Sequence, residues 1–125
     1  MTPFGAKLRE LRRVRGLTLQ EMAKSLEISS AYLSALEHGK RGRPSPMLVR
    51  QICTFFTIIW EEAEELERLV RVSHPRVVVD SAGLSPRATE LANLLAERIG
   101  DLSEDELRVF LEKLYSVSPK RPTRR

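Results

Sequence analysis

Apolar residues recur at helical spacing along most of the chain, and short polar or glycine-containing segments separate these stretches. The first stretch follows Thr2, with Pro3 at the first helical position, which is a common way for a helix to begin. Three residues form its inward stripe: Phe4, Leu8 and Leu11. Gly16 follows and suits the left-handed conformation that closes many helices. The pattern predicts a helix over about residues 3–15.

Two shorter helices are predicted next, separated by only a few residues. Thr18 and Glu21 form a Ser/Thr-x-x-Glu capping box, so a helix begins near Leu19. Ser29 is a suitable N-cap for another, which ends at Gly39. Helices this short are marginal alone in water. We therefore expect the pair to pack on the first helix.

The remainder of the first 73 residues contains two more predicted helices. Ser45 with Pro46 begins the fourth, and the fifth runs from about residue 59 to 72. Cys53 is the only cysteine and is expected to be a small buried hydrophobic residue on the fourth helix. Trp60 is expected to be a core residue where the fifth helix starts. Five helices in about 70 residues make one compact helical domain.

The second part of the chain has an extended segment followed by two helical patterns. Residues 75–84 include a β-branched run, which indicates an extended linker or an edge strand that pairs with another strand. Ser85 with Pro86 begins one helix, and the capping box of Ser103 and Glu106 begins the next. Two such amphipathic helices cannot bury both apolar stripes alone. We expect them to pack on the N-terminal domain or on a second subunit.

The segment LRELRRVRGLTLQEMAKSLEISSAYLSALEHGKRGRPSPMLVRQI resembles the lambda-repressor/Cro-type helix-turn-helix family, also called the XRE family. The resemblance covers roughly the first 60 residues. It departs from the family pattern at Leu19, where Gln is usual, and at Glu27, where the family has a turn glycine. A non-glycine residue at positive φ costs roughly 1 kcal/mol. The family also has an ion bridge between its first and third helices, at the positions of Arg12 and Glu37.

The resemblance, together with the residue patterns of the second half, predicts an all-α fold with four parts. Residues 1–73 are expected to be a five-helix, lambda-repressor-like helix-turn-helix DNA-binding domain. Residues 74–84 are a short extended linker, residues 85–116 a two-helix C-terminal dimerisation region, and residues 117–125 a basic disordered tail.

By the same resemblance, the third predicted helix lies in the major groove of DNA. The residues expected on or near its groove-facing side are Ser29, Ser30, Ala31, Tyr32, Ser34 and Ala35. Gln20 and the free N–H groups at the start of the second helix are expected to bind a phosphate. No Arg, Gln or Asn stands on the third helix, so the bidentate pairings that discriminate bases best are absent from it. Specificity is therefore modest or is shared with other elements.

The charge distribution indicates which other element takes part. The net charge is only +4, but residues 1–50 hold ten Lys/Arg against four Asp/Glu, whereas residues 51–118 hold seven against thirteen. Phosphate neutralisation supplies most non-specific affinity for DNA. In the loop after the third helix, we expect Lys40 and Arg41 to contact phosphates, Arg43 to probe the minor groove, and His38 to touch a phosphate.

These observations predict a sequence-specific DNA-binding transcriptional regulator, a repressor that binds double-stranded operator DNA as a homodimer. No catalytic constellation, phosphate-binding glycine loop or metal-ligand spacing occurs, so we expect no enzyme activity, cofactor or metal. The alternatives are an antitoxin-type autoregulator whose C-terminal half binds a partner protein, and a protein-interaction module. No signal peptide or membrane-length apolar run is present, and we expect a cytoplasmic protein associated with the bacterial nucleoid.

Overall fold

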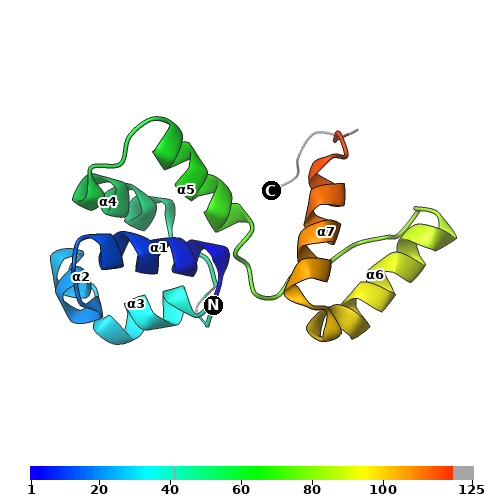
Figure 1. Ribbon diagram of the computed structural model, residues 1–125, viewed down its shortest axis with the longest axis horizontal. Helices are drawn as coiled ribbons and strands as arrows, with labels where there is room; N and C mark the ends of the chain where they lie inside the picture. Colours follow the sequence, from blue (N-terminus) through cyan, green and yellow to red (C-terminus); the bar gives the residue numbers. More distant parts are fainter. Residues whose placement is uncertain (41, 120–125) are drawn as a thin grey trace. The chain divides into compact units, whose positions relative to one another are not determined.

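The computed structural model describes residues 1–40 and 42–119, and all regular structure in these ranges is helical. The first five helices are α1 (Pro3–Val14), α2 (Leu19–Ser25), α3 (Ser30–Glu37), α4 (Pro46–Phe56) and α5 (Glu61–Arg71) (Figure 1). They are followed by α6 (Pro86–Arg98), the 3-10 turn η1 (Ile99–Asp101) and α7 (Glu104–Tyr115). The all-α prediction is confirmed, and the segment before α6 forms no strand.

The chain divides into two compact units, and the boundary falls between Val77 and Val78. The first unit holds α1 to α5, and the second holds α6, η1 and α7. None of the helices in the described ranges has both the length and the apolar content needed to cross a membrane.

Local signals determine where the helices of the first unit begin. The Thr2 hydroxyl accepts a hydrogen bond from the Gly5 N–H at 2.9 Å, and the Ser29 hydroxyl accepts one from the Tyr32 N–H at 3.0 Å. At α2 the expected capping box is complete, because Thr18 and Glu21 each bond the other's backbone N–H. Each of these caps satisfies donors that have no partner inside the helix.

A single hydrophobic core joins the five helices of the first unit. Its fully buried members come from α1, α2, α3, α4 and α5, and the largest are Phe4, Leu8, Met22, Leu33, Leu36, Ile52 and Leu66. Helix α1 contacts both α3 and α5 (Figure 1). Of the two short helices, α3 packs on α1 as the sequence predicted, and α2 packs against α3.

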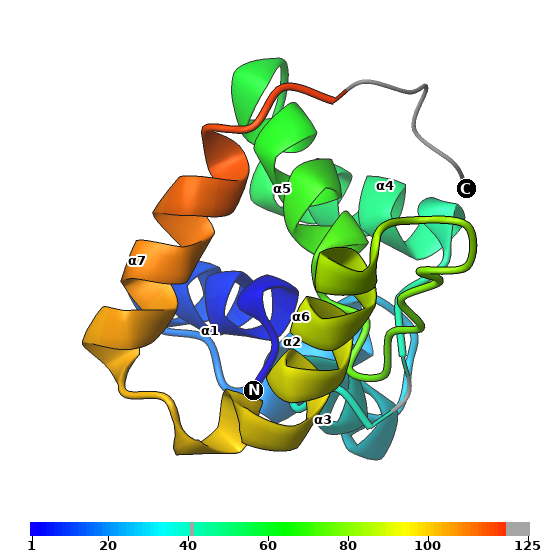
Figure 2. The ribbon, with the colours of Figure 1, turned by 90° about the vertical axis from the view of Figure 1, so that its right-hand side faces the viewer.

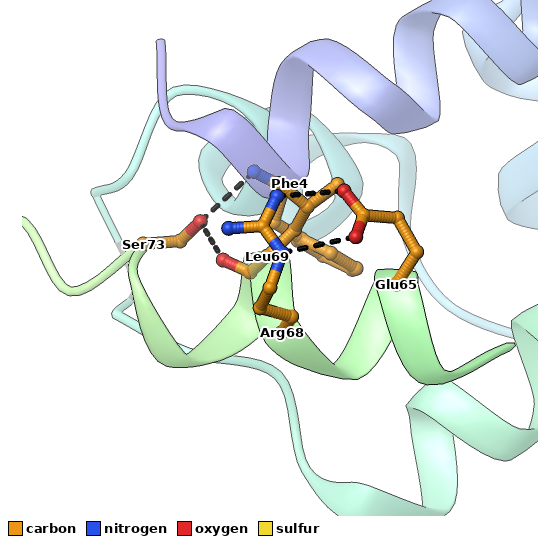
Figure 3. A network of polar contacts seen from close by, with 5 residues as sticks. All are labelled: Phe4, Glu65, Arg68, Leu69 and Ser73. Atoms are coloured by element: carbon orange, nitrogen blue, oxygen red, sulfur yellow. Dashed lines mark hydrogen bonds and ion pairs between the residues drawn. The ribbon is translucent and has the colours of Figure 1, made fainter. Parts of the chain in front are cut away.

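Ser73 attaches the end of α5 to the start of α1. Its hydroxyl accepts a hydrogen bond from the Phe4 N–H at 2.8 Å and donates one to the Leu69 carbonyl (Figure 3). The residue is 4% exposed, so no solvent competes for these bonds. Beside it, Arg68 forms two hydrogen bonds to the Glu65 carboxylate, which lower the pKa of Glu65. Nothing in the local sequence had indicated a role for Ser73.

The C-terminal end of α3 lies directly against the N-terminal half of α1. The Thr2 N–H donates to the Glu37 carbonyl at 3.3 Å, and a Cβ atom placed on Gly5 would lie 2.0 Å from that carbonyl oxygen. Only a glycine permits so close an approach. The Glu37 carboxylate is also buried, and Arg12 bonds both of its oxygens, at 3.2 and 3.3 Å. The expected bridge between Arg12 and Glu37 is confirmed.

The expectation that Trp60 is a core residue is wrong. Trp60 is 80% exposed and precedes α5, which begins at Glu61 and not at residue 59. The reason lies in the preceding turn, where Thr57 adopts a left-handed conformation and Ile58 enters the core in place of the tryptophan. Cys53 is half-buried against this core, and burial raises the pKa of its thiol.

We expect Gly5→Ala to weaken the attachment of α3 to α1. The added methyl group would overlap the Glu37 carbonyl, and overpacking of this kind costs about 1–3 kcal/mol of unfolding free energy. Urea denaturation of the full chain measures this loss. Gly100→Ala is the matched control, because a Cβ there meets nothing within 4 Å. Equal stability of the two variants would contradict the close approach.

Trp60 is the only tryptophan of the chain, so its fluorescence tests its exposure directly. We expect acrylamide to quench the folded protein nearly as efficiently as the protein unfolded in urea, because solvent already surrounds the indole ring. A strong loss of quenching in the folded state would show that the ring is covered.

Candidate nucleic-acid interface

The turn between α2 and α3 places Glu27 in a left-handed conformation, with a φ of 57°. The Ile28 N–H donates to the Ala23 carbonyl at 3.0 Å, and the Glu27 N–H donates to the Lys24 carbonyl at 3.1 Å. This pair of bonds is the Schellman motif, whose central position favours glycine. The same pair of bonds closes α1 at Gly16 and α3 at Gly39. Glu27 therefore adopts the turn geometry of a glycine at a cost of about 1 kcal/mol.

Helix α3 has one buried face and one open face. Leu33, Leu36 and Glu37 are buried and fix the inward side. The outward side is formed by four residues with small side chains: Ser30, Ala31, Ser34 and Ala35. Ala31 is exposed and the other three are half-buried. A binding partner can approach the backbone of α3 closely at this face, because no side chain at these four positions is larger than a hydroxymethyl group.

The other predicted residues of α3 have structural contacts. The Ser29 hydroxyl caps the helix by binding the Tyr32 N–H, and Tyr32 packs at the edge of the hydrophobic core. His38 is exposed at the end of the helix, where its Nδ1 lies 2.9 Å from the Ser34 carbonyl oxygen. The structure thus gathers Ser30, Ala31, Ser34, Ala35 and His38 on the open side, and uses Ser29 and Tyr32 to hold the helix.

The loop that follows α3 begins with a backbone attachment to the helix. The Lys40 N–H donates to the Ala35 carbonyl at 2.8 Å, while the Lys40 side chain is exposed. Arg43 is also exposed, after Gly42 with a φ of 75°. Arg41 lies outside the described residues. The loop therefore presents Lys40 and Arg43 to solvent immediately after the open face of α3.

Three polar residues outside α3 differ in how much they can offer a ligand: Gln20, Glu21 and Arg15. Gln20 is exposed in the first turn of α2. At the same helix, the hydrogen bond from the Thr18 N–H lowers the pKa of Glu21 and keeps its carboxylate ionised. Arg15 is engaged elsewhere, because it donates to the carbonyls of Phe55 and Phe56 at 3.2 and 2.7 Å. Arg15 thus joins the ends of α1 and α4.

Arg50 on α4 is an exposed cation that sequence reasoning did not single out. It lines an open groove of about 470 Å³ together with Glu27, Met47 and other residues of α2 and α4. Its position beside the α2–α3 turn depends on tertiary packing, which the local sequence does not reveal.

Among the described residues, no group of His, Cys, Asp and Glu side chains could hold a metal ion.

A comparison with known protein families matches the part of the chain that contains α2 and α3. A family model described as a helix-turn-helix domain matches residues 3–58. The chain is 44% identical over 61 residues to the uncharacterized HTH-type transcriptional regulator RghRB of Bacillus subtilis, and 38% identical over 61 residues to the HTH-type transcriptional repressor RghR of the same species. It is 44% identical over 45 residues to the HTH-type transcriptional regulator PrpR of Mycobacterium tuberculosis.

The match to the family model lies within the first unit. The aligned segments cover 49% of this chain against each Bacillus relative and 36% against PrpR, and they span 44%, 45% and 9% of the respective relatives. This chain therefore covers less than half of each relative, and the family model does not extend to α6 and α7. No solved structure matches the chain.

The family match, the named relatives and the helix-turn-helix geometry of α2 and α3 agree. All three relatives are named as transcriptional regulators, which is consistent with a protein that is not an enzyme. The geometry is also consistent with the lambda-repressor/Cro type. Residues 3–58 of this chain match the helix-turn-helix domain family, and the relatives that the chain resembles are named as transcriptional regulators.

Proposed function

We propose that this chain is a sequence-specific repressor that binds operator DNA as a homodimer and occludes promoters. The observation that carries the proposal is the open face of α3, whose small polar side chains can enter the major groove while the opposite face is buried. One of the relatives is named as a transcriptional repressor, which supports the direction of control. A protein with this role acts in the bacterial cytoplasm, at the nucleoid.

In the proposed complex, each element of the interface has a different task. The hydroxyls of Ser30 and Ser34 bond base edges or phosphates, and the methyl groups of Ala31 and Ala35 contact thymine methyl groups. Gln20 and His38 bind phosphates on either side of α3, and Ser29 and Tyr32 hold the helix at the groove.

Cations supply most of the affinity in this proposal. Lys40 and Arg41 neutralise phosphates, and Arg43 enters an adjacent narrow minor groove, where the negative potential of A·T-rich sequence attracts arginine. Because the face of α3 lacks bidentate base readers, discrimination between sequences relies partly on DNA shape.

Selection of binding sites from random duplexes by the full chain tests the proposal. We expect a two-fold symmetric site with half-sites about one helical turn apart. Ala31→Glu places a negative charge on the α3 face, and like-charge contact costs several kcal/mol, so we expect affinity for the selected site to fall by about 100-fold or more. Ala82→Glu is the control, because Ala82 is exposed in the second unit. Failure to select any site, or equal loss in both variants, would contradict the proposal.

The salt dependence of binding tests the loop separately. We expect Lys40→Ala and Arg43→Ala each to reduce the slope of log affinity against log salt by about 0.9 for every phosphate that the variant no longer neutralises. Arg108→Ala removes the same charge from α7 and should leave the slope unchanged. Unchanged slopes in all three variants would remove the loop from the interface, and the absence of any steep slope in the parent chain would favour a protein-interaction module.

A further inference from the structure

We propose that α6 and α7 form a dimer interface with a second copy of this chain, in which α7 of one copy packs against α6 of the other. This inference deepens the proposed function, because it rests on the homodimer proposed above and assigns its surface. It begins from an unusual feature of the second unit: no residue of α6, η1 or α7 is buried.

Both helices nevertheless carry a continuous apolar stripe. On α6 the stripe consists of Ala88, Leu91, Ala92, Leu95 and Ile99, and on α7 of Leu107, Phe110, Leu111 and Leu114. The two helices diverge from η1 and do not pack side by side, as both views show (Figures 1 and 2). The arms of this V-shaped pair therefore leave their stripes uncovered. Helices of 12 and 13 residues are marginal in water without a packing partner.

The composition of the stripes favours a second copy as the partner. They contain no charged residue, so bringing two copies together opposes no like charges within the contact. Two alanines alternate with larger residues on α6, whereas every stripe residue of α7 is large, and facing surfaces of this kind interdigitate well. A two-fold dimer uses this complementarity twice, because α7 of each copy meets α6 of the other. The result is a four-helix bundle.

The charged flank of α7 is already paired within the helix. The Arg108 guanidinium lies 2.8 Å from the Glu112 carboxylate and 3.9 Å from the Asp105 carboxylate. At the start of α7, the hydrogen bond from the Ser103 N–H to the Glu106 carboxylate lowers the pKa of Glu106 and satisfies the cap. The charged flank of α7 therefore needs no partner from another molecule, whereas the apolar stripe of α7 remains uncovered.

The amount of exposed apolar surface is what such an interface requires. Six stripe residues are 37–63% exposed: Leu91, Leu95, Ile99, Phe110, Leu111 and Leu114. Side chains of this size have roughly 150–200 Å² of surface each, so the stripes expose of the order of 600 Å². A specific interface buries about 800 Å² from each partner, polar rim included.

Two substitutions on α7 distinguish the stripe from the rest of the helix. Leu111 is 52% exposed on the stripe, and Val109 is 54% exposed on the opposite face, two residues away. We expect Leu111→Asp to convert a full-chain dimer into a monomer, measured by sedimentation over a range of concentrations. We expect Val109→Asp to remain dimeric, because Val109 lies on the face opposite the stripe. It is a matched control, since both variants introduce the same charge at nearly the same exposure. A cooperative thermal transition in both variants confirms that the first unit is still folded.

Three results would overturn the inference: a monomeric parent chain, a Leu111→Asp variant that remains dimeric, or two variants that dissociate equally.

A measurement of DNA binding separates this inference from the proposed function. We expect monomeric Leu111→Asp to lose about 100-fold or more in affinity for a two-half-site operator and little for a single half-site, because linking two sites multiplies affinity. A stable dimer that binds no DNA would instead refute the proposed function and leave the interface standing.

Discussion

The attachment of Glu37 to α1 is the constraint on which the position of α3 depends. Two contacts act on this one residue, since its carbonyl lies against Gly5 and its buried carboxylate is bonded by Arg12. Removing one partner of such a pair leaves an uncompensated buried charge, which costs about 3–5 kcal/mol. The Arg12 Nε atom is itself buried without a hydrogen-bond partner. An incompletely satisfied pair is a poor source of stability, so its value lies in fixing how α3 sits on α1.

The sequence predicted those features that arise from neighbours in the chain. Caps and helix ends involve residues three to six positions apart, so Thr18, Ser29 and Gly39 could be assigned by type and spacing. Gly5 and Ser73 act on residues 32 and 69 positions away, through contacts that exist only after folding. The bridge between Arg12 and Glu37 came from family resemblance, because spacing alone cannot pair residues 25 positions apart.

Trp60 shows how one turn can reverse an assignment based on residue type. Hydrophobic character alone places tryptophan in a core, and both Ile59 and Trp60 satisfy that rule. The left-handed Thr57 directs Ile58 inward, through a hydrogen bond from its N–H to the Cys53 carbonyl at 2.8 Å, and the next two side chains then remain outside. Threonine gives little warning of this conformation, which glycine would have signalled. Glu27 hides the same conformation in the α2–α3 turn.

In the proposed complex, the small side chains on the open face of α3 make selectivity depend on the dimer that α6 and α7 form. A recognition helix with serines and alanines gains little discrimination from each half-site, because it lacks the bidentate contacts worth about 1–3 kcal/mol per base. A dimer adds a requirement that no single domain can impose, namely two half-sites at a fixed separation. Phosphate contacts from the loop raise affinity for all sequences alike. In the proposed complex, selectivity therefore depends on the geometry of the dimer more strongly than it would with a stronger reading helix.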